Sequence, residues 1–262
     1  MSRWSPDNDY GKDPEVARRR LGMLVVGGLG LVVVLGLYRN QVHPPQGPED
    51  FEKLKLRHIR ALELGEFRVE SGEVAICDPG YGDHLIREGQ IATKIGDVLN
   101  GTWNARLVRY TFISPRATDN AELWAYHESY TPPESPEWED LHPDIGVDSG
   151  QAGIFDYRHF GKDESIPEDY VWNREKLLVP ADRWYSYNCD LTGWSRHRAG
   201  VLRYGAVSSS GWGDGGYPAH AIKNAEGKYV ALRLVFIPRE YCELVEPEAD
   251  PPGDDPKPEE GQ

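Results

Sequence analysis

One uninterrupted apolar stretch stands out near the start of the chain. Residues 21–38 read LGMLVVGGLGLVVVLGLY and carry no charge. As a helix this segment rises about 27 Å, close to the thickness of the hydrocarbon core of a bilayer. Three arginines, Arg18 to Arg20, precede it and Arg39 alone follows it, and this basic excess favours a cytoplasmic N-terminus. We predict a single-pass signal-anchor in the cell membrane, which contacts lipid through residues 21–38 and holds the C-terminal domain outside the cytoplasm.

Two alternatives to an uncleaved anchor fit the segment less well. A cleaved signal peptide has a shorter apolar core and a small-x-small cleavage site, whereas YRNQVH follows here. A buried core helix seldom contains a charge-free run of this length. Residues 1–20 are then a short cytoplasmic N-terminus.

A linker and a stalk helix are expected over residues 39–64. The linker is rich in proline. In residues 49–64, the side chains that would share one helix face recur every three or four residues, which predicts a helix. That face consists of Phe51, Leu54, His58 and Leu62. Gly65 is suited to end the helix.

Short alternating and apolar runs over residues 65–245 predict a β-rich globular domain. The expected strands are residues 73–78, 102–112, 123–129, 152–156, 220–224 and 228–237. The last two flank Ala225-Glu226-Gly227, a short hairpin loop. In the last strand the face formed by Val230, Leu232, Leu234 and Phe236 is expected to be the more buried. Residues 129–144, acidic and rich in proline, are expected to form a long loop.

One helix is expected within this domain, in SIPEDYVWNREKLL. Ser165 is a suitable N-cap, Pro167 lies in the first turn, and Glu168 completes a capping box. Strands and helices do not alternate, which disfavours a doubly wound sheet. The predicted fold is mainly β, a β-sandwich or open barrel with one or two helices, preceded by the transmembrane helix.

Charge and cysteine content narrow the range of functions. The net charge is −14, of which residues 246–262, with seven acidic residues and one lysine, contribute −6. We expect this tail to be disordered, and the acidity of the rest disfavours nucleic-acid binding. Cys77, Cys189 and Cys242 lack the spacing of a zinc site. Outside the cytoplasm two of them could be oxidised to a disulfide, although buried structural thiols are the interpretation that we favour.

Three stretches together resemble an uncharacterised, largely bacterial family, domain of unknown function 4241. They contain the motifs CDPGYG, VDSGQAGIFD and SSGWGDGGYP, and the resemblance covers roughly residues 65–238. It implies a compact β-rich domain in which the motifs lie close together, but no activity. This chain departs from the family by its anchor and its acidic tail.

The motif GWGDGGYP has a structural and a functional interpretation. Its glycines permit positive φ on both sides of Asp214, whose carboxylate can accept bonds from nearby backbone amides and fix a turn. Pro218 would then stiffen the exit, and Trp212 and Tyr217 would pack over the loop. Alternatively, a ligand approaches the bare backbone and contacts Asp214. The binding candidates of this region are Asp214, Trp212, Tyr217 and His220.

The motif VDSGQAGIFD contains Asp148-Ser149-Gly150, which is similar to the Asp-Ser/Thr-Gly loop of aspartic proteases. Those enzymes need two such carboxylates, and the chain has no second copy. The alternative is an Asx turn in which Asp148 binds its own backbone and Gly150 takes the bend. The chain also lacks the G-x-S-x-G motif of a hydrolase elbow.

Acidic residues in and near the motifs suggest a further possibility. Outside the cytoplasm, calcium is the natural partner of several carboxylates, although EF-hand spacing is absent. The metal candidates are Asp78, Asp148, Asp156 and Asp214, with Asp83 close by.

These observations favour a membrane-anchored, non-enzymatic interaction domain that needs no cofactor and binds a protein or glycan partner. One alternative is a metal-binding or metal-assisted hydrolytic domain that uses Asp148 and Asp214, with His220. Another is a carbohydrate-binding module, because eight tryptophans are available to stack on sugars.

Overall fold

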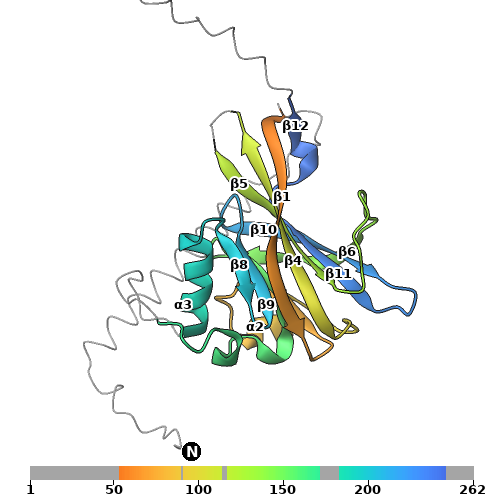
Figure 1. Ribbon diagram of the computed structural model, residues 1–262, viewed down its shortest axis with the longest axis vertical. Helices are drawn as coiled ribbons and strands as arrows, with labels where there is room; N and C mark the ends of the chain where they lie inside the picture. The colour runs from red at the N-terminus through yellow and green to blue at the C-terminus, as the bar shows by residue number, and fades with distance from the viewer. Residues whose placement is uncertain (1–52, 90, 114–116, 172–182, 246–262) are drawn as a thin grey trace, which may run out of the picture. The chain divides into compact units, whose positions relative to one another are not determined.

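The computed structural model describes residues 53–89, 91–113, 117–171 and 183–245. The described chain is mainly β, as predicted, and consists of two sheets and two α-helices (Figure 1). The seven-stranded sheet, sheet A, curls as a half-barrel and has the order β12 (Cys242–Leu244), β1 (Leu54–Val69), β4 (Gly101–Phe112), β5 (Thr118–His127), β11 (Tyr229–Val235), β10 (Gly215–Lys223) and β6 (Glu139–Val147). The five-stranded sheet, sheet B, has the order β3 (Thr93–Ile95), β2 (Val74–Cys77), β7 (Gln151–Asp156), β9 (Gly205–Ser209) and β8 (Ala199–Leu202).

Sheet B is covered on both faces. Side chains alternate along β2, so Val74 and Ile76 join the core shared with sheet A, whereas Ala75 and Cys77 face a second core. The helices α2 (Asp83–Glu88) and α3 (Arg183–Cys189) contribute Ile86 and Trp184 to that second core. Every residue of β7 is buried, which agrees with the continuous apolar run from Ala152 to Phe155 in its middle.

Short helical turns connect several of the remaining elements. They are η1 (Tyr157–His159), η2 (Asp163–Ser165), the π-helical η3 (Asp190–Trp194) and η4 (Arg239–Tyr241). The last of these leads into β12, which pairs in parallel with the start of β1.

Six predicted strands are present, as β2, β4, β5, β7, β10 and β11. The predicted hairpin is also present, since Lys223 pairs with Tyr229 across a loop in which Gly227 has a φ of 77°. Along β11 and the residue after it, Val230, Leu232, Leu234 and Phe236 are all at most 3% exposed. The opposite face carries the half-buried Tyr229 and Arg233 besides the buried Ala231 and Val235. The predicted difference between the two faces is confirmed.

The predicted stalk helix is wrong over its described part. Residues 54–64 belong to β1, which pairs with β4 from Leu56 to Val69. Gly65 does not end a helix but lies at a bulge with a φ of 131°. The three-to-four spacing in this stretch arises by coincidence, because most of its side chains are exposed on both faces of the strand.

Two further predictions are corrected. Ser165 ends η2 and donates its hydroxyl to the His159 carbonyl at 2.6 Å, and residues 166–171 are not helical. The rest of the predicted helix, from residue 172, lies outside the described residues. The loop expected over residues 129–144 is shorter, because β6 begins at Glu139.

The described residues contain no helix that is both long and apolar enough to cross a membrane. The predicted anchor at 21–38, the linker and the tail at 246–262 lie outside the described residues. The three cysteines are free thiols, with Cys77 and Cys242 buried and Cys189 half-buried.

Candidate functional site

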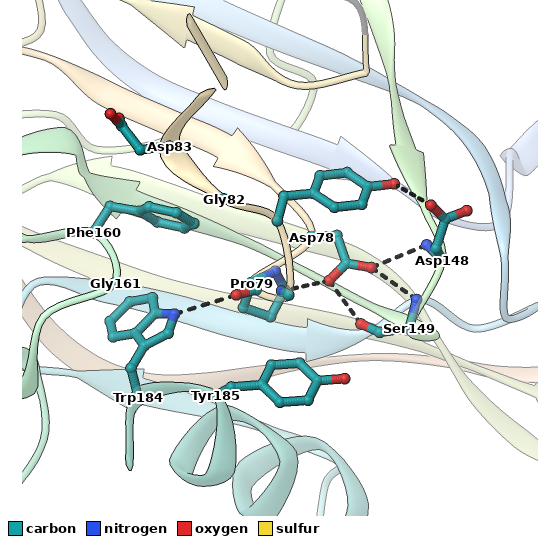
Figure 2. Close-up of a pocket in the computed structure, with 12 residues that line it drawn as sticks. Asp78, Pro79, Gly82, Asp83, Asp148, Ser149, Phe160, Gly161, Trp184 and Tyr185 are labelled. Atoms are coloured by element: carbon teal, nitrogen blue, oxygen red, sulfur yellow. Dashed lines mark hydrogen bonds between the residues drawn. The ribbon is translucent and has the colours of Figure 1, made fainter. Parts of the chain in front are cut away.

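A pocket of about 780 Å³ opens where the end of β2 meets the bend between β6 and β7 (Figure 2). The CDPGYG motif supplies one wall and the Asp-Ser-Gly of VDSGQAGIFD supplies another. Phe160, from the turn after η1, and Trp184 and Tyr185, from α3, complete it. Two of the three motifs therefore converge at one place.

The carboxylate of Asp78 is the centre of this arrangement. Its Oδ1 accepts the Gly80 amide at 2.7 Å and the Ser149 hydroxyl at 2.7 Å. Its Oδ2 accepts the amides of Asp148 at 3.0 Å and Ser149 at 2.8 Å. A carboxylate offers about four lone-pair positions, so these four bonds occupy them all.

These bonds explain how the chain passes from one sheet to the other. Residues 148–150 lie between the last residue of β6 in sheet A and the first of β7 in sheet B. Asp78, which is only 1% exposed, fixes this bend to the end of β2. The predicted Asx turn is therefore replaced by a long-range contact, although Gly150 takes the bend as expected, with a φ of 67°.

The helix α3 is fastened to the same place. The indole of Trp184 donates to the Pro79 carbonyl at 3.3 Å. The side chain of Gln151, at the start of β7, donates to the Cys189 sulfur at 3.4 Å and accepts the Thr192 hydroxyl at 2.9 Å. The aromatic wall of the pocket is thus held against the loop that carries Asp78.

Two exposed carboxylates lie at the rim. Asp148 accepts the Tyr81 hydroxyl at 3.0 Å. Asp83 accepts the Tyr157 hydroxyl at 2.7 Å and pairs with Arg87 at 2.9 Å. Both carboxylates keep unused lone pairs toward solvent, so they are able to accept hydrogen bonds from a ligand.

The hydroxyl and thiol groups beside the pocket are held protonated. Burial, and then the charge of Asp148, raise the pKa of Tyr81 far above its usual value. Burial likewise raises the pKa values of Tyr185 and Cys189. At neutral pH these groups are hydrogen-bond donors rather than nucleophiles or bases.

The third motif forms a turn beside the pocket rather than part of its wall. Gly213 has a φ of 93°, and its carbonyl accepts the hydroxyls of Ser210 at 2.6 Å and Tyr217 at 2.8 Å. Asp214 is exposed, and no described residue donates a hydrogen bond to its carboxylate. The turn is therefore fixed by its carbonyl and not, as predicted, by Asp214.

The rest of this motif departs from the prediction in two details, at Gly215-Gly216 and at Trp212. Gly215 and Gly216 belong to β10 and do not have positive φ. Trp212 is 50% exposed instead of packing over the loop, whereas Tyr217 is buried against Phe236. Pro218 lies at a register shift between β10 and β6, where its missing N–H does not interrupt the ladder.

The remaining candidates lie elsewhere. Asp156, fully buried, accepts the amides of Ser71 at 2.8 Å and Arg158 at 2.9 Å. It pairs with Val74, about 13 Å along β2 from Asp78 at 3.3 Å per residue. His220 lies on β10 in sheet A, where its Nδ1 is 2.8 Å from Asp140. Burial, and then the charge of Arg233, lower its pKa.

Of the four metal candidates, only Asp78 and Asp148 line the pocket. Asp214 lies near Asp148, because Gly215 pairs with Val147. The described residues contain no group of three or more histidine, cysteine, aspartate or glutamate side chains arranged to hold a metal ion. Asp78 and Asp156 are instead acceptors for backbone amides.

Several site residues were missed from the sequence. Tyr81, Phe160, Trp184 and Tyr185 line the pocket, yet none was a candidate. Pro79-Gly80 directly after a strand is a turn signal, and it could have drawn attention to Tyr81. Nothing local marks Phe160 or the α3 aromatics, because only the tertiary fold brings them to the end of β2.

Comparison with known proteins leaves the family open. No family model, curated protein or solved structure matches this chain. The resemblance to domain of unknown function 4241 therefore stays a prediction, carried by three motifs of which two build the pocket.

Proposed function

We propose that this protein is a membrane-anchored, non-enzymatic binding domain and that the pocket at the end of β2 binds a carbohydrate. The observation that carries this proposal is the pairing of exposed acceptors with aromatic rings around one rigid centre. Asp83 and Asp148 accept hydrogen bonds at the rim (Figure 2). The rings of Tyr81 and of Tyr185, which belongs to α3, line the same pocket.

A sugar ring presents hydroxyl donors around its edge and an apolar C–H face. The two rim carboxylates match the first, and the half-buried rings of Tyr81, Tyr185 and Phe160 match the second. About 780 Å³ lies in the usual range for a small-ligand site.

Binding is favoured over catalysis by the state of the groups that could react. The carboxylate of Asp78 has all its accepting positions filled, so it is not free to take a proton or to bind a metal. Tyr81, Tyr185 and Cys189 have raised pKa values. The pocket therefore offers fixed donors and acceptors, as a binding site requires.

The test is isothermal titration of the full-length protein, in neutral detergent, with a panel of neutral mono- and disaccharides. For any sugar that binds, Asp148→Asn should weaken the affinity at least about tenfold, because a hydrogen bond to a charged acceptor contributes about 1.5–3 kcal/mol. Asp214→Asn is the matched control, since its exposed carboxylate does not line the pocket, and it should leave the affinity unchanged.

Two outcomes would contradict the assignment. Binding that is lost in Asp214→Asn but kept in Asp148→Asn would move the site to the third motif. Hexylammonium, a cation with an apolar tail, is titrated in the same way. If it binds and no sugar does, the rim carboxylates select a cation instead.

The proposed localisation at the membrane rests on residues 21–38 alone. We propose that they form the anchor, with the binding domain outside the cytoplasm. Full-length protein should sediment with membranes after cell lysis, and deletion of residues 21–38 should release it. Untrimmed full-length protein that stays in the supernatant would end this part of the proposal without affecting the pocket.

A further inference from the structure

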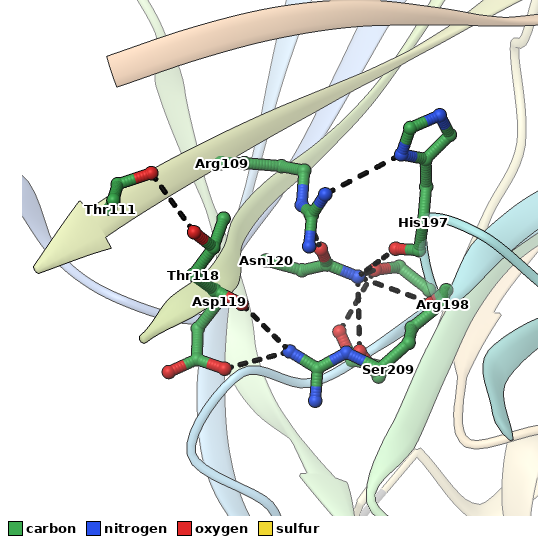
Figure 3. A network of polar contacts seen from close by, with 9 residues as sticks. Arg109, Thr111, Thr118, Asp119, Asn120, His197, Arg198 and Ser209 are labelled. Atoms are coloured by element: carbon green, nitrogen blue, oxygen red, sulfur yellow. Dashed lines mark hydrogen bonds and ion pairs between the residues drawn. The ribbon is translucent and has the colours of Figure 1, made fainter. Parts of the chain in front are cut away.

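A cluster of basic side chains lies where sheet A meets the turn before β8 (Figure 3). The basic cluster consists of Arg60 on β1, Arg109 on β4, and Arg196, His197 and Arg198 in the turn. Among the described residues, one carboxylate, Asp119, joins it and binds Arg198 at 2.7 Å. The whole chain carries a net charge of −14, so a local concentration of positive charge is unexpected and suggests a binding role.

The positive charges are close enough to oppose one another. Arg60 and Arg109 are direct partners in the β1–β4 register, and like charges opposite each other destabilise a sheet. Burial, and then the charge of Arg198, lower the pKa of Arg109, and Arg60 adds to this effect. No described acidic residue forms an ion pair with Arg60 or Arg196, both of which are exposed.

The cluster is nevertheless held in a fixed geometry. The fully buried Asn120 accepts Arg109 Nε at 3.0 Å through Oδ1. Its Nδ2 donates toward the carbonyls of His197 and Arg198, each at 3.1 Å. Figure 3 shows the guanidinium of Arg109 between Asn120 and His197, whose Nδ1 lies 3.4 Å from Nη1.

Backbone strain is concentrated at the same place. Arg198 has a φ of 54°, a left-handed conformation that costs energy for a residue with a side chain. Its guanidinium is tied to Asp119 and to the Thr118 carbonyl at 3.2 Å. The strained turn presents Arg196 and His197 beside Arg109.

We propose that Arg60, Arg109, Arg196 and His197 form a binding site for a single oxyanion, a phosphate or sulfate group. Such a ligand offsets the mutual repulsion of the arginines and accepts their N–H donors in the planar geometry that guanidinium favours. The acidity of the rest of the chain repels an extended polyanion, so the ligand is one oxyanion and not a nucleic acid. The phosphate can be free in solution or carried by a lipid headgroup.

The experiment is thermal melting of the full-length protein in neutral detergent, with phosphate added at constant ionic strength against sodium chloride. A phosphate concentration about ten times the dissociation constant should raise the midpoint by about 3–6 °C. Arg60→Gln and Arg196→Gln should each remove at least half of this rise. Both residues are exposed, so neither substitution threatens folding.

Arg68→Gln is the matched control, because Arg68 is an exposed arginine on the same strand as Arg60 but outside the cluster. It should keep the full response. The proposal is overturned if chloride gives the same rise as phosphate, if phosphate gives none, or if Arg68→Gln loses as much as Arg60→Gln. In phosphate-free buffer the melting midpoint of Arg60→Gln should be no lower than that of the natural protein, because the substitution relieves the repulsion between the arginines. A clearly lower midpoint would also contradict the proposal.

A second arm identifies the source of the phosphate. Water-soluble dihexanoyl phosphatidate is compared with inorganic phosphate, and dihexanoyl phosphatidylcholine controls for the acyl chains. Phosphatidate that binds through the same arginines at least tenfold more tightly than phosphate indicates a lipid ligand. Equal or weaker binding indicates free phosphate.

Discussion

Replacement of Asp78 by Asn tests whether one buried carboxylate fixes the passage between the two sheets. The substitution keeps the size and shape of the side chain but turns one accepting oxygen into an NH₂ donor. Asp78 accepts bonds from Gly80, from Asp148 and twice from Ser149. Asn leaves one oxygen to serve them, so two of the four bonds are lost.

The expected loss of stability follows from these contacts. Hydrogen bonds to a charged group contribute about 1.5–3 kcal/mol each, and two of them at the lower value give about 3 kcal/mol. For a domain of this size 1 kcal/mol corresponds to about 2–4 °C in the melting midpoint. We therefore expect Asp78→Asn to lower the midpoint by about 6–12 °C.

The assay is thermal melting of the full-length protein, followed by tryptophan fluorescence. Trp184, whose indole donates to the Pro79 carbonyl next to Asp78, is one of the eight tryptophans that contribute to this signal. Asp214→Asn is the control, because its carboxylate is exposed, and its midpoint should move by no more than about 2 °C. If the two variants melt together, Asp78 does not hold the bend and the account of the pocket is wrong.

Three further predictions test other parts of the fold. In Gly205→Ala the new Cβ would lie 2.8 Å from the Ile154 carbonyl oxygen and 2.6 Å from the Phe155 ring, so the free energy of unfolding in urea should fall by about 2–3 kcal/mol. In the control Gly216→Ala the new Cβ has no atom within 4 Å, and the free energy of unfolding should change by less than about 1 kcal/mol. Titration of the native protein with a thiol reagent should modify Cys189 at most, because Cys77 and Cys242 are buried free thiols, and all three should react in urea; rapid reaction of three thiols in the native state would contradict the packing. Because the pKa of His220 is lowered, the folded state binds fewer protons than the unfolded state, so the contribution of His220 to stability is complete above the unfolded pKa of about 6.5 and is lost as the pH falls toward the folded pKa. The melting midpoint should therefore decrease between pH 7.5 and 5.5, and it should decrease less steeply in His220→Gln. An identical slope in both proteins would refute this assignment.

Sequence patterns predicted the strands whose two faces differ. In β11 the face of Val230, Leu232 and Leu234 is fully buried, whereas the half-buried Tyr229 and Arg233 lie on the other face, and the loop at Gly227 marked the hairpin. β1 failed because its first half is exposed on both faces, so alternation carries no signal there. Its structure is imposed by pairing with β4, which no local pattern in residues 54–64 reveals.

The strand β6 was missed for a related reason. It contains Pro143 and several acidic residues, which are signals of a loop in an isolated stretch of sequence. The strand lies at the edge of sheet A, where a missing N–H and exposed charges are tolerated. Sheet position, which depends on residues far away in the chain, therefore decided its structure.

The candidate site was predicted in part, and the division has a physical cause. Asp78 and Asp148 were predicted to be metal ligands because both lie in the motifs, and they do lie together. Their relation is different, however, since the Asp148 amide is bound by the Asp78 carboxylate. From the sequence, a carboxylate that binds backbone amides cannot be distinguished from one that awaits a cation, because the deciding donors come from 70 residues away.

The two sites proposed here share a construction principle. Asp78 belongs to sheet B and binds the bend where the chain leaves sheet A, whereas Asn120 belongs to sheet A and binds the turn that leads into β8 of sheet B. Apolar packing between sheets is not directional, so buried polar groups at the crossings fix how the sheets are aligned. The same anchoring holds the exposed charges that flank each crossing, acidic beside Asp78 and basic beside Asn120. Since each group of charges is held by its own buried residue, Asp78→Asn should spare the phosphate response, and loss of Arg60 should spare the pocket.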